Sequence, residues 1–307
     1  MTDIPEAMTP DTELEHSGLC ALVGRPNVGK STILNALLGE KVSIVTRKPQ
    51  TTRHRILGVL NRPGAQTVLV DTPGLHERGK RRLNQQMNRT ALEALADIDV
   101  VVLVVRGTQW TEADQRVLER LEGTSAPVIL AINQVDRIQD KRQLLPHMEW
   151  LSGLREFAAL VPLSATRADN LQPLEDEIVQ RLPAGPPLFP ADQVTDRDLG
   201  FRLGELIRER LMLHVGQEVP YTTSVQVDQL SREEGLTRVA AIIWVETKGQ
   251  KAIVIGRGGE MLKRIGRSAR LQMEELLGER VHLDLWAKVK AKWTDDQRAL
   301  RELGYAE

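Results

Sequence analysis

The segment GRPNVGKS, from Gly24 to Ser31, constrains the fold of this chain more than any other segment. It matches G-x-x-x-x-G-K-S, the pattern of a loop that wraps nucleotide phosphates between a strand and a helix. The apolar run LCALV precedes the loop, and the helix-like STILNALL follows it. Because all three parts occur in register, we interpret the match as a phosphate-binding loop and not as a chance glycine turn. The sequence therefore predicts an α/β P-loop NTPase fold.

The rest of the N-terminal half continues this α/β pattern. The apolar runs RILGVL, TVLVDT, VVVLVV, PVILAIN and LVPLSA alternate with helix-like segments such as TEADQRVLERL and LEDEIVQRL. Near-continuous Val, Ile and Leu suit strands that are buried on both faces, so we expect a mostly parallel sheet with helices on both faces. Thr111 and Asp114 are placed to cap the helix that begins there.

A proline-rich segment, LPAGPPLFPADQVTDRD, marks a domain boundary, because its four prolines favour a stiff, extended connector. Beyond it we predict a helix (FRLGELIRERLMLH), two strands (YTTSVQVDQL and TRVAAIIWVET), a helix around Lys251 to Val254, a longer helix (EMLKRIGRSARLQMEELLG) and a strand (VHLDLWAKVK). The predicted regions are a disordered tail over 1–17, a nucleotide-binding domain over 18–182, a linker over 183–200, and a second domain with a C-terminal tail over 201–307. Trp150, Trp244 and Trp286 are expected to pack into cores.

Composition excludes several classes of protein. The 307 residues are 41% hydrophobic and 27% charged, which is typical of a soluble globular protein, and no apolar run approaches the roughly 20 residues of a membrane span. The acidic first segment lacks the basic and apolar regions of a secretory signal. Cys20 is the only cysteine, which excludes internal disulfides and fits a reducing cytosol. A net charge of −1 still permits a local basic patch.

The phosphate loop predicts how a triphosphate is held. Gly24 and Gly29 let the backbone approach the phosphates, Lys30 neutralises the β and γ oxygens, and Ser31 offers its hydroxyl to Mg²⁺. The segment INQVD then selects the base, because the carboxylate of Asp136 accepts hydrogen bonds from the N1–H and 2-amino groups of guanine. Adenine offers no such pair of donors, and a site of this kind rejects it by up to about 10⁴–10⁵-fold.

Two further segments supply parts that respond to the γ-phosphate. In VDTPG, Asp71 is expected to hold the Mg²⁺ shell through water, and Gly74 to donate its N–H to the γ-phosphate. In QTTRHR, Thr52 is favoured over Thr51 to complete the metal shell when GTP is bound. In the segment LSAT, Ser164 and Ala165 are expected to donate a backbone N–H to the guanine oxygen.

The position after Gly74 is unusual for a GTPase. Ras-type switches have a glutamine there that orients the attacking water, whereas this chain has Leu75. Leucine cannot orient or deprotonate water, so positioning and charge neutralisation by Lys30, Thr52 and Gly74 must carry the chemistry. His76 is a candidate base, but an exposed loop histidine is more often a bystander.

A second glycine loop, GRGG from Gly256 to Gly259, lacks the Lys-Ser of the first loop and the G-x-G-x-x-G of dinucleotide sites. G-x-x-G between two helices is the signature of a KH domain, which clamps about four single-stranded nucleotides. The order of elements and the basic bias favour a type II KH domain over a plain helix-turn-helix with a solvated basic face. The predicted RNA contacts are Ile255, Gly256, Arg257, Gly258, Gly259, Lys263, Arg264 and Arg267, with further basic residues at Lys251, Arg270, Lys288, Lys290 and Lys292.

Taken together, GRPNVGKS, QTTRHR, DTPGL, NQVD, SAT, VIGRGGEMLKRIG and VHLDLWAKVK resemble the Era family of bacterial GTPases over nearly the whole chain. The resemblance implies a Ras-like G domain followed by a type II KH domain, with GTP or GDP and Mg²⁺ as cofactors. It implies binding to the 3′ end of 16S rRNA, a role in 30S subunit assembly, and partial peripheral association with the inner membrane. The helix over 201–213 is expected to cover the KH sheet, and lipid contact through Arg202, Arg208 and Arg210 is an alternative.

The family's site residues transfer onto matching positions of this chain. They are Asn27, Val28, Gly29, Lys30, Ser31 and Thr32 in the phosphate loop, Thr52 and Asp71 at the metal, and Asn133, Gln134 and Asp136 at the base. Asn27 resembles an asparagine that helps hold K⁺ in related potassium-activated GTPases. Gln134 departs from the family, which usually has lysine there; a shorter, neutral side chain puts nucleotide affinity in doubt more than the choice of base.

These features favour a GTP-driven RNA-binding switch, in which the Pro-rich connector carries a change from the G domain to the KH domain. Two alternatives remain: an RNA-binding assembly module with GTP as a nearly static ligand, and an RNA-modification GTPase, for which the chain has no spare segment. We expect a cytoplasmic monomer with no DNA partner.

We predict slow unaided hydrolysis, on the order of 10⁻² s⁻¹ or below, because no residue replaces the water-orienting glutamine. Single-turnover hydrolysis of GTP by the purified chain measures this rate, and tens of turnovers per second would contradict the prediction. The same measurement repeated in Na⁺ and in K⁺ tests the role of Asn27, since equal rates count against a potassium site.

Overall fold

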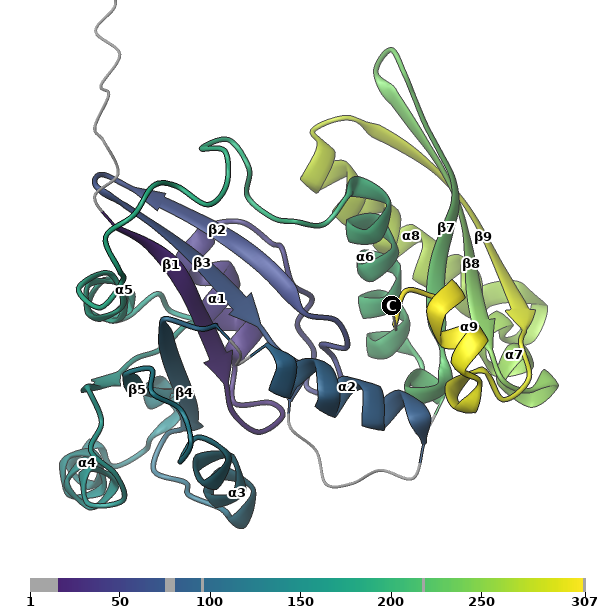
Figure 1. The fold of residues 1–307 in the computed structure, drawn as a ribbon. Helices are drawn as coiled ribbons and strands as arrows, with labels where there is room; N and C mark the ends of the chain where they lie inside the picture. Colours follow the sequence, from purple (N-terminus) through teal and green to yellow (C-terminus); the bar gives the residue numbers. More distant parts are fainter. Residues whose placement is uncertain (1–15, 75–80, 95–96, 217–218, 306–307) are drawn as a thin grey trace, which may run out of the picture.

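The computed structural model describes residues 16–74, 81–94, 97–216 and 219–305. The expectations for Leu75 and His76 lie outside these described residues. Two α/β units lie next to each other, an N-terminal one around a six-stranded sheet and a C-terminal one around a three-stranded sheet (Figure 1). Among the described helices, none is long and apolar enough to cross a membrane.

The N-terminal unit is a G domain with helices on both faces of its sheet. Its strands are β1 (His16–Val23), β2 (Ile56–Arg62), β3 (Ala65–Asp71), β4 (Val100–Arg106), β5 (Val128–Asn133) and β6 (Ala159–Pro162). Its helices are α1 (Lys30–Leu38), α2 (Arg82–Glu93), α3 (Glu112–Arg120), α4 (Leu144–Ser152) and α5 (Leu171–Val179). The strand order is β2-β3-β1-β4-β5-β6, and every neighbouring pair is parallel except β2 with β3, which confirms the expected mostly parallel sheet.

Burial on both faces explains the unbroken apolar runs of the central strands. In β4, Val100, Val102 and Val104 join the core that α1 and α5 cover. The alternate residues Val101, Leu103 and Val105 join the core on the side of α3 and α4. Successive side chains of a strand point to opposite faces, so a strand with two covered faces needs no polar positions.

Local capping chemistry sets the start of α3 as predicted. Thr111 accepts from the N–H of Asp114, and the Asp114 carboxylate accepts from the N–H of Thr111, which completes a capping box. The helices α2 and α4, and a C-terminal helix α9 (Gln297–Glu302), were not predicted. In α2 the buried residues Leu83, Met87 and Ala91 recur at helical spacing, a signal that the prediction missed. The helix α4 contains a proline and α9 has only six residues, so tertiary contacts decide their conformation.

The C-terminal unit is a KH domain whose sheet has the order β7-β8-β9. Its elements are α6 (Leu199–His214), β7 (Ser224–Glu233), β8 (Leu236–Val245), α7 (Lys248–Ile255), α8 (Glu260–Leu277) and β9 (Arg280–Val289). This is the predicted order, and α6 and α8 share one buried core with the sheet, so α6 covers the sheet as expected. The predicted start of the first KH strand, at Tyr221, was wrong, because β7 begins at Ser224. Residues 219–222 form a 3-10 turn instead, in which the Thr222 and Thr223 hydroxyls donate to the carbonyls of Val219 and Pro220.

The prediction that three tryptophans pack into cores was wrong, because none of the three belongs to a core cluster of the described residues. Trp150 and Trp286 are each 49% exposed, and Trp244 is half-buried with Lys288 and Lys290 near its ring. Trp286 and Trp244 lie on strands that are covered on one face only. A strand position alone does not reveal which face is covered, so residue type misled the prediction.

The Pro-rich connector lies along the edge strand β2 of the G domain. The N–H of Val59 donates to Val194 O, and the Thr195 hydroxyl donates to Leu57 O. Gln66, buried in β3, accepts from the N–H groups of Leu188 and Phe189. The connector is thus extended, as its prolines predict, and it is hydrogen-bonded to the domain that precedes it.

The segment after β9 returns to the G domain and packs on α2. Trp293 and Tyr305 of this segment share a buried cluster with Leu83 and Met87 of α2. The indole N–H of Trp293 donates to Thr222 O at 3.0 Å, so this segment is also fixed to the KH domain. Residues that the sequence indicated only as a tail therefore join the two domains.

We predict that Trp293→Ala destabilises the chain by about 3–5 kcal/mol, because it empties a fully buried site between the domains. Urea unfolding of the full chain measures this change. Trp286→Ala is the matched control, and its half-exposed ring predicts a cost within about 0.5 kcal/mol. Equal costs for the two variants would show that the cluster around Trp293 does not hold the domains.

Candidate functional site

The phosphate loop folds around close backbone contacts that only glycine permits. A Cβ on Gly24 would lie 2.5 Å from Val104 O, and one on Gly29 would lie 2.2 Å from the Asn133 amide nitrogen. Both glycines have positive φ, 151° and 105°, and Gly29 precedes α1 without a side-chain cap. The first N–H groups of α1 therefore remain available to an anion.

Lys30 is buried beneath this loop with its ammonium group close to the backbone. It is 6% exposed and donates to Gly24 O at 2.9 Å and Arg25 O at 3.2 Å. Burial lowers the pKa of Lys30 to about 8, while the nearby Asp71 carboxylate opposes the shift. A buried cation with few partners is suited to bind phosphate oxygens, which would restore its charge.

A cavity of about 970 Å³ opens in front of this loop. Its walls come from the phosphate loop, from residues 44–52, from Gly74, from the base-side residues Asn133 and Gln134, and from Met212 and Leu213 of the KH helix α6. Thr32 of α1 lines the cavity. Val28 of the phosphate loop is fully buried. The structure thus brings most of the predicted phosphate residues around one space with Asn133 and Gln134 of the base side, whereas Asp136, Ser164 and Ala165 do not line it.

The three predicted metal ligands meet at one point. The Ser31 hydroxyl lies 2.6 Å from Asp71 Oδ2 and 2.8 Å from the Thr52 hydroxyl, and Thr52 lies 3.3 Å from the same carboxylate oxygen. Ser43, which sequence reasoning missed, also donates to Asp71 Oδ2 at 2.8 Å. Thr51 instead bonds Thr46 and Lys48 O, so the structure favours Thr52 as the switch threonine.

The donor set suits Mg²⁺. Asp71 is fully buried, and its other oxygen, Oδ1, has no hydrogen-bond partner in the described structure. Burial raises the pKa of Asp71 despite the hydroxyl donors and Lys30. An unpartnered buried carboxylate oxygen beside two hydroxyls offers the hard oxygen ligands that hydrated Mg²⁺ prefers.

Asn133 joins the loops of the base side. Its amide donates to Val28 O at 2.9 Å, and its oxygen accepts from the N–H groups of Gln134 and Ala165. Ser164 donates its hydroxyl to Asp136 at 2.7 Å, which fixes one carboxylate oxygen. The loop that carries Ser164 and Ala165 thus orients Asn133 and Asp136, with the N–H of Ser164 bonded to Asp169 O and that of Ala165 to Asn133. Donation from this loop to the guanine oxygen stays a prediction.

Gly74 and Asn27 lie at the phosphate side of the cavity. Gly74 packs against Pro26, and a Cβ there would lie 3.0 Å from the proline ring. The Asn27 amide donates to Arg47 O at 3.0 Å, so it ties the phosphate loop to the loop that carries Thr52. We call residues 44–53, which include Thr52, the switch loop.

The second glycine loop is open to solvent. Gly258 and Gly259 have φ of 60° and 83°, and a Cβ at either position would meet no atom within 4 Å. Gly256 is different, because its Cβ would lie 2.7 Å from the Met261 side chain. The loop therefore presents bare backbone to a ligand while Gly256 keeps it packed against α8.

Basic and apolar side chains surround this loop. Arg257, Lys263, Arg264 and Arg267 are exposed, and none of them pairs with an acid in the described parts of the chain. Ile253 of α7 is 51% exposed and Ile255 is half-buried, whereas Val254 packs into the core. Free cations beside an exposed apolar strip are what a phosphate backbone and unstacked bases require.

The switch loop is bound directly by the KH helix α6. Glu209 accepts from the N–H of Val45 at 3.0 Å and pairs with Lys41 at 2.6 Å. Lys48 donates to Met212 O and Val215 O, so it caps the last turn of α6. Charged donors at helix C-termini satisfy orphan carbonyls and are favoured by the helix dipole.

Two buried arginines complete this junction. Arg208 of α6, 1% exposed, donates to Thr51 O of the switch loop and pairs with Glu205 at 2.6 Å. Arg53 of the switch loop donates to Thr223 O and Pro220 O at 2.6 and 2.8 Å. Its other contact is the hydroxyl of Tyr305, whose ring stacks on His54.

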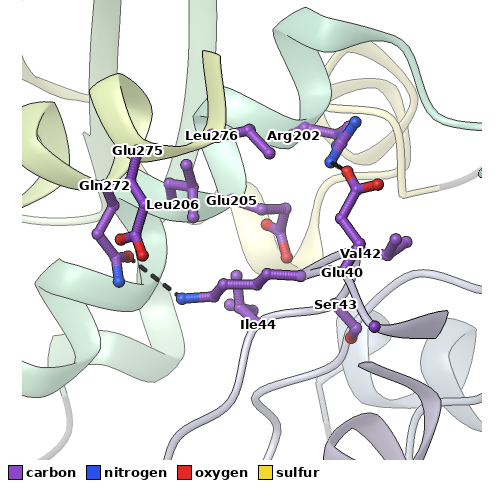
Figure 2. Close-up of a pocket in the computed structure, with 12 residues that line it drawn as sticks. Glu40, Val42, Ser43, Ile44, Arg202, Glu205, Leu206, Gln272, Glu275 and Leu276 are labelled. Atoms are coloured by element: carbon purple, nitrogen blue, oxygen red, sulfur yellow. Dashed lines mark hydrogen bonds and ion pairs between the residues drawn. The ribbon is translucent and has the colours of Figure 1, made fainter. Parts of the chain in front are cut away.

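A second cavity lies at this junction between residues 39–44 and the helices α6 and α8 (Figure 2). Arg202 pairs with Glu40 across it (Figure 2). Lys41 donates to the Gln272 side chain at 3.2 Å. Carboxylates line it, which does not suit phosphates. The lipid alternative for α6 is corrected here, because Arg202 and Arg208 contact the G domain and Arg210 pairs with Glu209.

Sequence reasoning missed Ser43, Lys48, Arg53, Arg208 and Tyr305. The signal was faint: Arg53 follows the switch threonines, and the apolar stripe of α6 carries charged residues that a sheet-covering helix does not need. Lys48, Arg53, Arg208 and Tyr305 make contacts across the junction with residues more than a hundred positions away, beyond the reach of local patterns. Ser43 lies only 28 positions from Asp71, but no motif marks it.

Both domains of the chain have known relatives. Residues 19–134 match the family model described as "50S ribosome-binding GTPase", and residues 218–294 match the one described as "KH domain". GTPase Era of Pseudomonas savastanoi pv. phaseolicola is 50% identical over 297 residues, which are 97% of this chain and 99% of that protein. GTPase Era of Pseudomonas aeruginosa (strain UCBPP-PA14) is 51% identical over 290 residues, covering 94% of this chain and 95% of that protein.

Two solved structures are similar over both domains. One is Era in complex with MgGDPNP and nucleotides 1506-1542 of 16S ribosomal RNA, with a TM-score of 0.92 and 37% identity, covering 95% of this chain and 100% of that chain. The other is an Aquifex aeolicus Era variant bound to GDP.AlF4-, with the same four values.

We predict that Lys30→Met weakens nucleotide binding by at least about 100-fold, because it removes a buried donor to the phosphates. The nucleotide-free variant should be at least as stable as the wild type, since burial disfavours the charged lysine. Nucleotide titration and urea unfolding measure the two effects, with the exposed Lys141→Met as control. A less stable variant that retains nucleotide affinity would contradict this role.

Proposed function

The chain belongs to the Era family of GTPases, and on that premise we propose that GTP in its G domain controls how its KH domain holds the single-stranded 3′ end of 16S rRNA. The chain is a GTPase that uses GTP or GDP with Mg²⁺, and its second domain is a KH domain. We propose further that it assists assembly of the 30S subunit. The Era structure with bound 16S rRNA nucleotides supports this proposal.

In the proposed nucleotide site, Lys30 and the backbone of Gly24 to Thr32 hold the phosphates. Ser31, Thr52 and Asp71 are the residues that would hold Mg²⁺, which supplies charge neutralisation when bound. Asn133 and Asp136 hold guanine, and Gly74 donates its N–H to the γ-phosphate. The K⁺ proposed beside Asn27 stays a prediction, as does the activation of water near Leu75.

In the proposed RNA site, the backbone of residues 256–259 approaches phosphates where side chains would collide, although the N–H groups of Gly256 and Gly259 are bonded to Ala252 O and Gly256 O. Arg257, Lys263, Arg264 and Arg267 supply the charge, and Ile253 and Ile255 contact bases. The open space in front of Gly258 and Gly259 supports this assignment. The charges and the apolar strip together fit an unpaired ribonucleotide strand better than duplex DNA.

One observation carries the proposed coupling: the same stretch of the switch loop contacts both the predicted metal ligands and the KH domain. Thr52 lies in hydrogen-bond contact with Ser31, and Thr51 and Arg53 on either side of it bond residues of the KH domain. A ligand that moves Thr52 must therefore change contacts with α6. This route is more direct than the connector that the sequence suggested, because it involves the loop itself.

We propose a cytoplasmic monomer, and peripheral contact with the inner membrane stays a prediction from the family. The alternative of a nearly static GTP ligand is distinguished by RNA-stimulated hydrolysis, which the switch requires and the static module does not.

We predict that RNA affinity differs by at least about fivefold between the chain loaded with a non-hydrolysable GTP analogue and with GDP. Fluorescence anisotropy with a short single strand of the 16S rRNA 3′ end measures both affinities at fixed salt. Equal affinities would contradict the coupling.

The same assay separates the two sites. Gly259→Asp should abolish RNA binding, because it adds a negative charge at the phosphate position, and should leave basal GTP hydrolysis unchanged. Gly235→Asp is the matched control, since Gly235 also has a positive φ, 72°, and open space in front of it, in the β7–β8 turn. RNA binding retained in Gly259→Asp would rule out the second loop as the contact.

A further inference from the structure

Gln134 occupies the position from which a side chain reaches back over the phosphate loop. Its amide nitrogen lies 3.4 Å from Asn27 O and 3.5 Å from Val28 O. The residue has a φ of 65°, in the left-handed region that non-glycine residues seldom adopt. The Asn133 side chain holds this conformation by accepting the N–H of Gln134 at 2.8 Å. The backbone is thus set so that the side chain points at the loop.

A glutamine amide can take either of two orientations, and only one of them suits this place. Asn27 O and Val28 O are both acceptors, so the NH₂ end must face them. Arg137 donates to the oxygen of the same amide at 3.2 Å. Because a guanidinium has donors only, it requires the oxygen end on its side. Arg137 and the phosphate loop therefore select the same orientation from opposite sides.

Arg137 has no competing role in the described structure. It is exposed, lines the nucleotide cavity, and forms no ion pair among the described residues. The neighbouring Asp136 has its own cation, Arg167, at 3.9 Å. Arg137 is therefore a cation at the rim of the cavity whose described hydrogen bond is to Gln134.

We propose that Arg137 is a positioning residue for nucleotide binding that acts through Gln134. Gln134 braces the phosphate loop with its NH₂ group, and Arg137 locks that amide and supplies the positive charge that glutamine lacks. The planar guanidinium is also suited to cover the face of a bound purine. The pair thus does together what one long cationic side chain at position 134 would do alone. This inference rests on the proposed placement of guanine beside Asp136.

The test is a double-mutant cycle measured as GDP affinity with a fluorescent GDP analogue. Arg137→Ala should weaken binding by about fivefold, because the amide loses its fixed orientation at a partly exposed site. Arg137→Lys should restore part of the affinity. In a Gln134→Lys background, Arg137→Ala should change affinity by less than about twofold, since lysine reaches the loop carbonyls unaided. The unfolding midpoint of the nucleotide-free protein should not move in any variant.

Controls separate this inference from the proposed site itself. Arg142→Ala removes an exposed arginine that bonds Asp140 and should leave affinity unchanged. Asp136→Ala should lose GDP binding. If it does, and if Arg137→Ala binds GDP as tightly as the wild type, then the positioning role of Arg137 is overturned while the proposed base site stands. The same loss from Arg137→Ala in both backgrounds also overturns it, because the effect would not pass through Gln134. Unchanged binding in Asp136→Ala would instead overturn the base site.

Discussion

The buried carboxylate of Asp71 is the interaction on which both domains depend. It lies at the end of β3 without solvent, and three hydroxyls from the phosphate loop and the following segment converge on one of its oxygens. A buried carboxylate is costly unless it is bonded or paired with a cation, so this centre holds the loop residues tightly in place. A hydrated cation that replaced those hydroxyl contacts would release Ser31, Ser43 and Thr52 from Asp71 and change the position of the segments that carry them.

Such a change would reach the KH domain directly, because neighbouring residues in the chain contact α6. From Ser43 and Thr52 the chain runs into residues whose backbone groups bond Glu209 and Arg208 of α6. Both side chains are buried, and removing a partner from a buried charge is more disruptive than removing an exposed one. The junction is therefore a buried, hydrogen-bonded contact and not a flexible tether.

Local chemistry made much of this architecture predictable. GRPNVGKS, the capping pair Thr111 and Asp114, and the GRGG loop each depend on contacts within a few residues, and the sequence carried their full signal. The exposed Trp286 and the 3-10 turn at 219–222 were beyond it, because tertiary packing decides both. Arg53 and Tyr305 lie 252 positions apart in sequence, so no periodicity could have paired them. Residue types and local motifs therefore predicted the binding chemistry, whereas the contacts between residues far apart in the sequence could not be predicted.

The connector that lies along β2 has a consequence for how the two domains can be separated. An outer strand of a sheet presents unpaired peptide groups that invite other chains to add to it. Here residues 194 and 195 occupy part of that border through Val59 and Leu57. A fragment ending near residue 182 would uncover the border and would tend to self-associate. A stable isolated G domain must therefore retain the Pro-rich connector, although its composition is that of a simple linker.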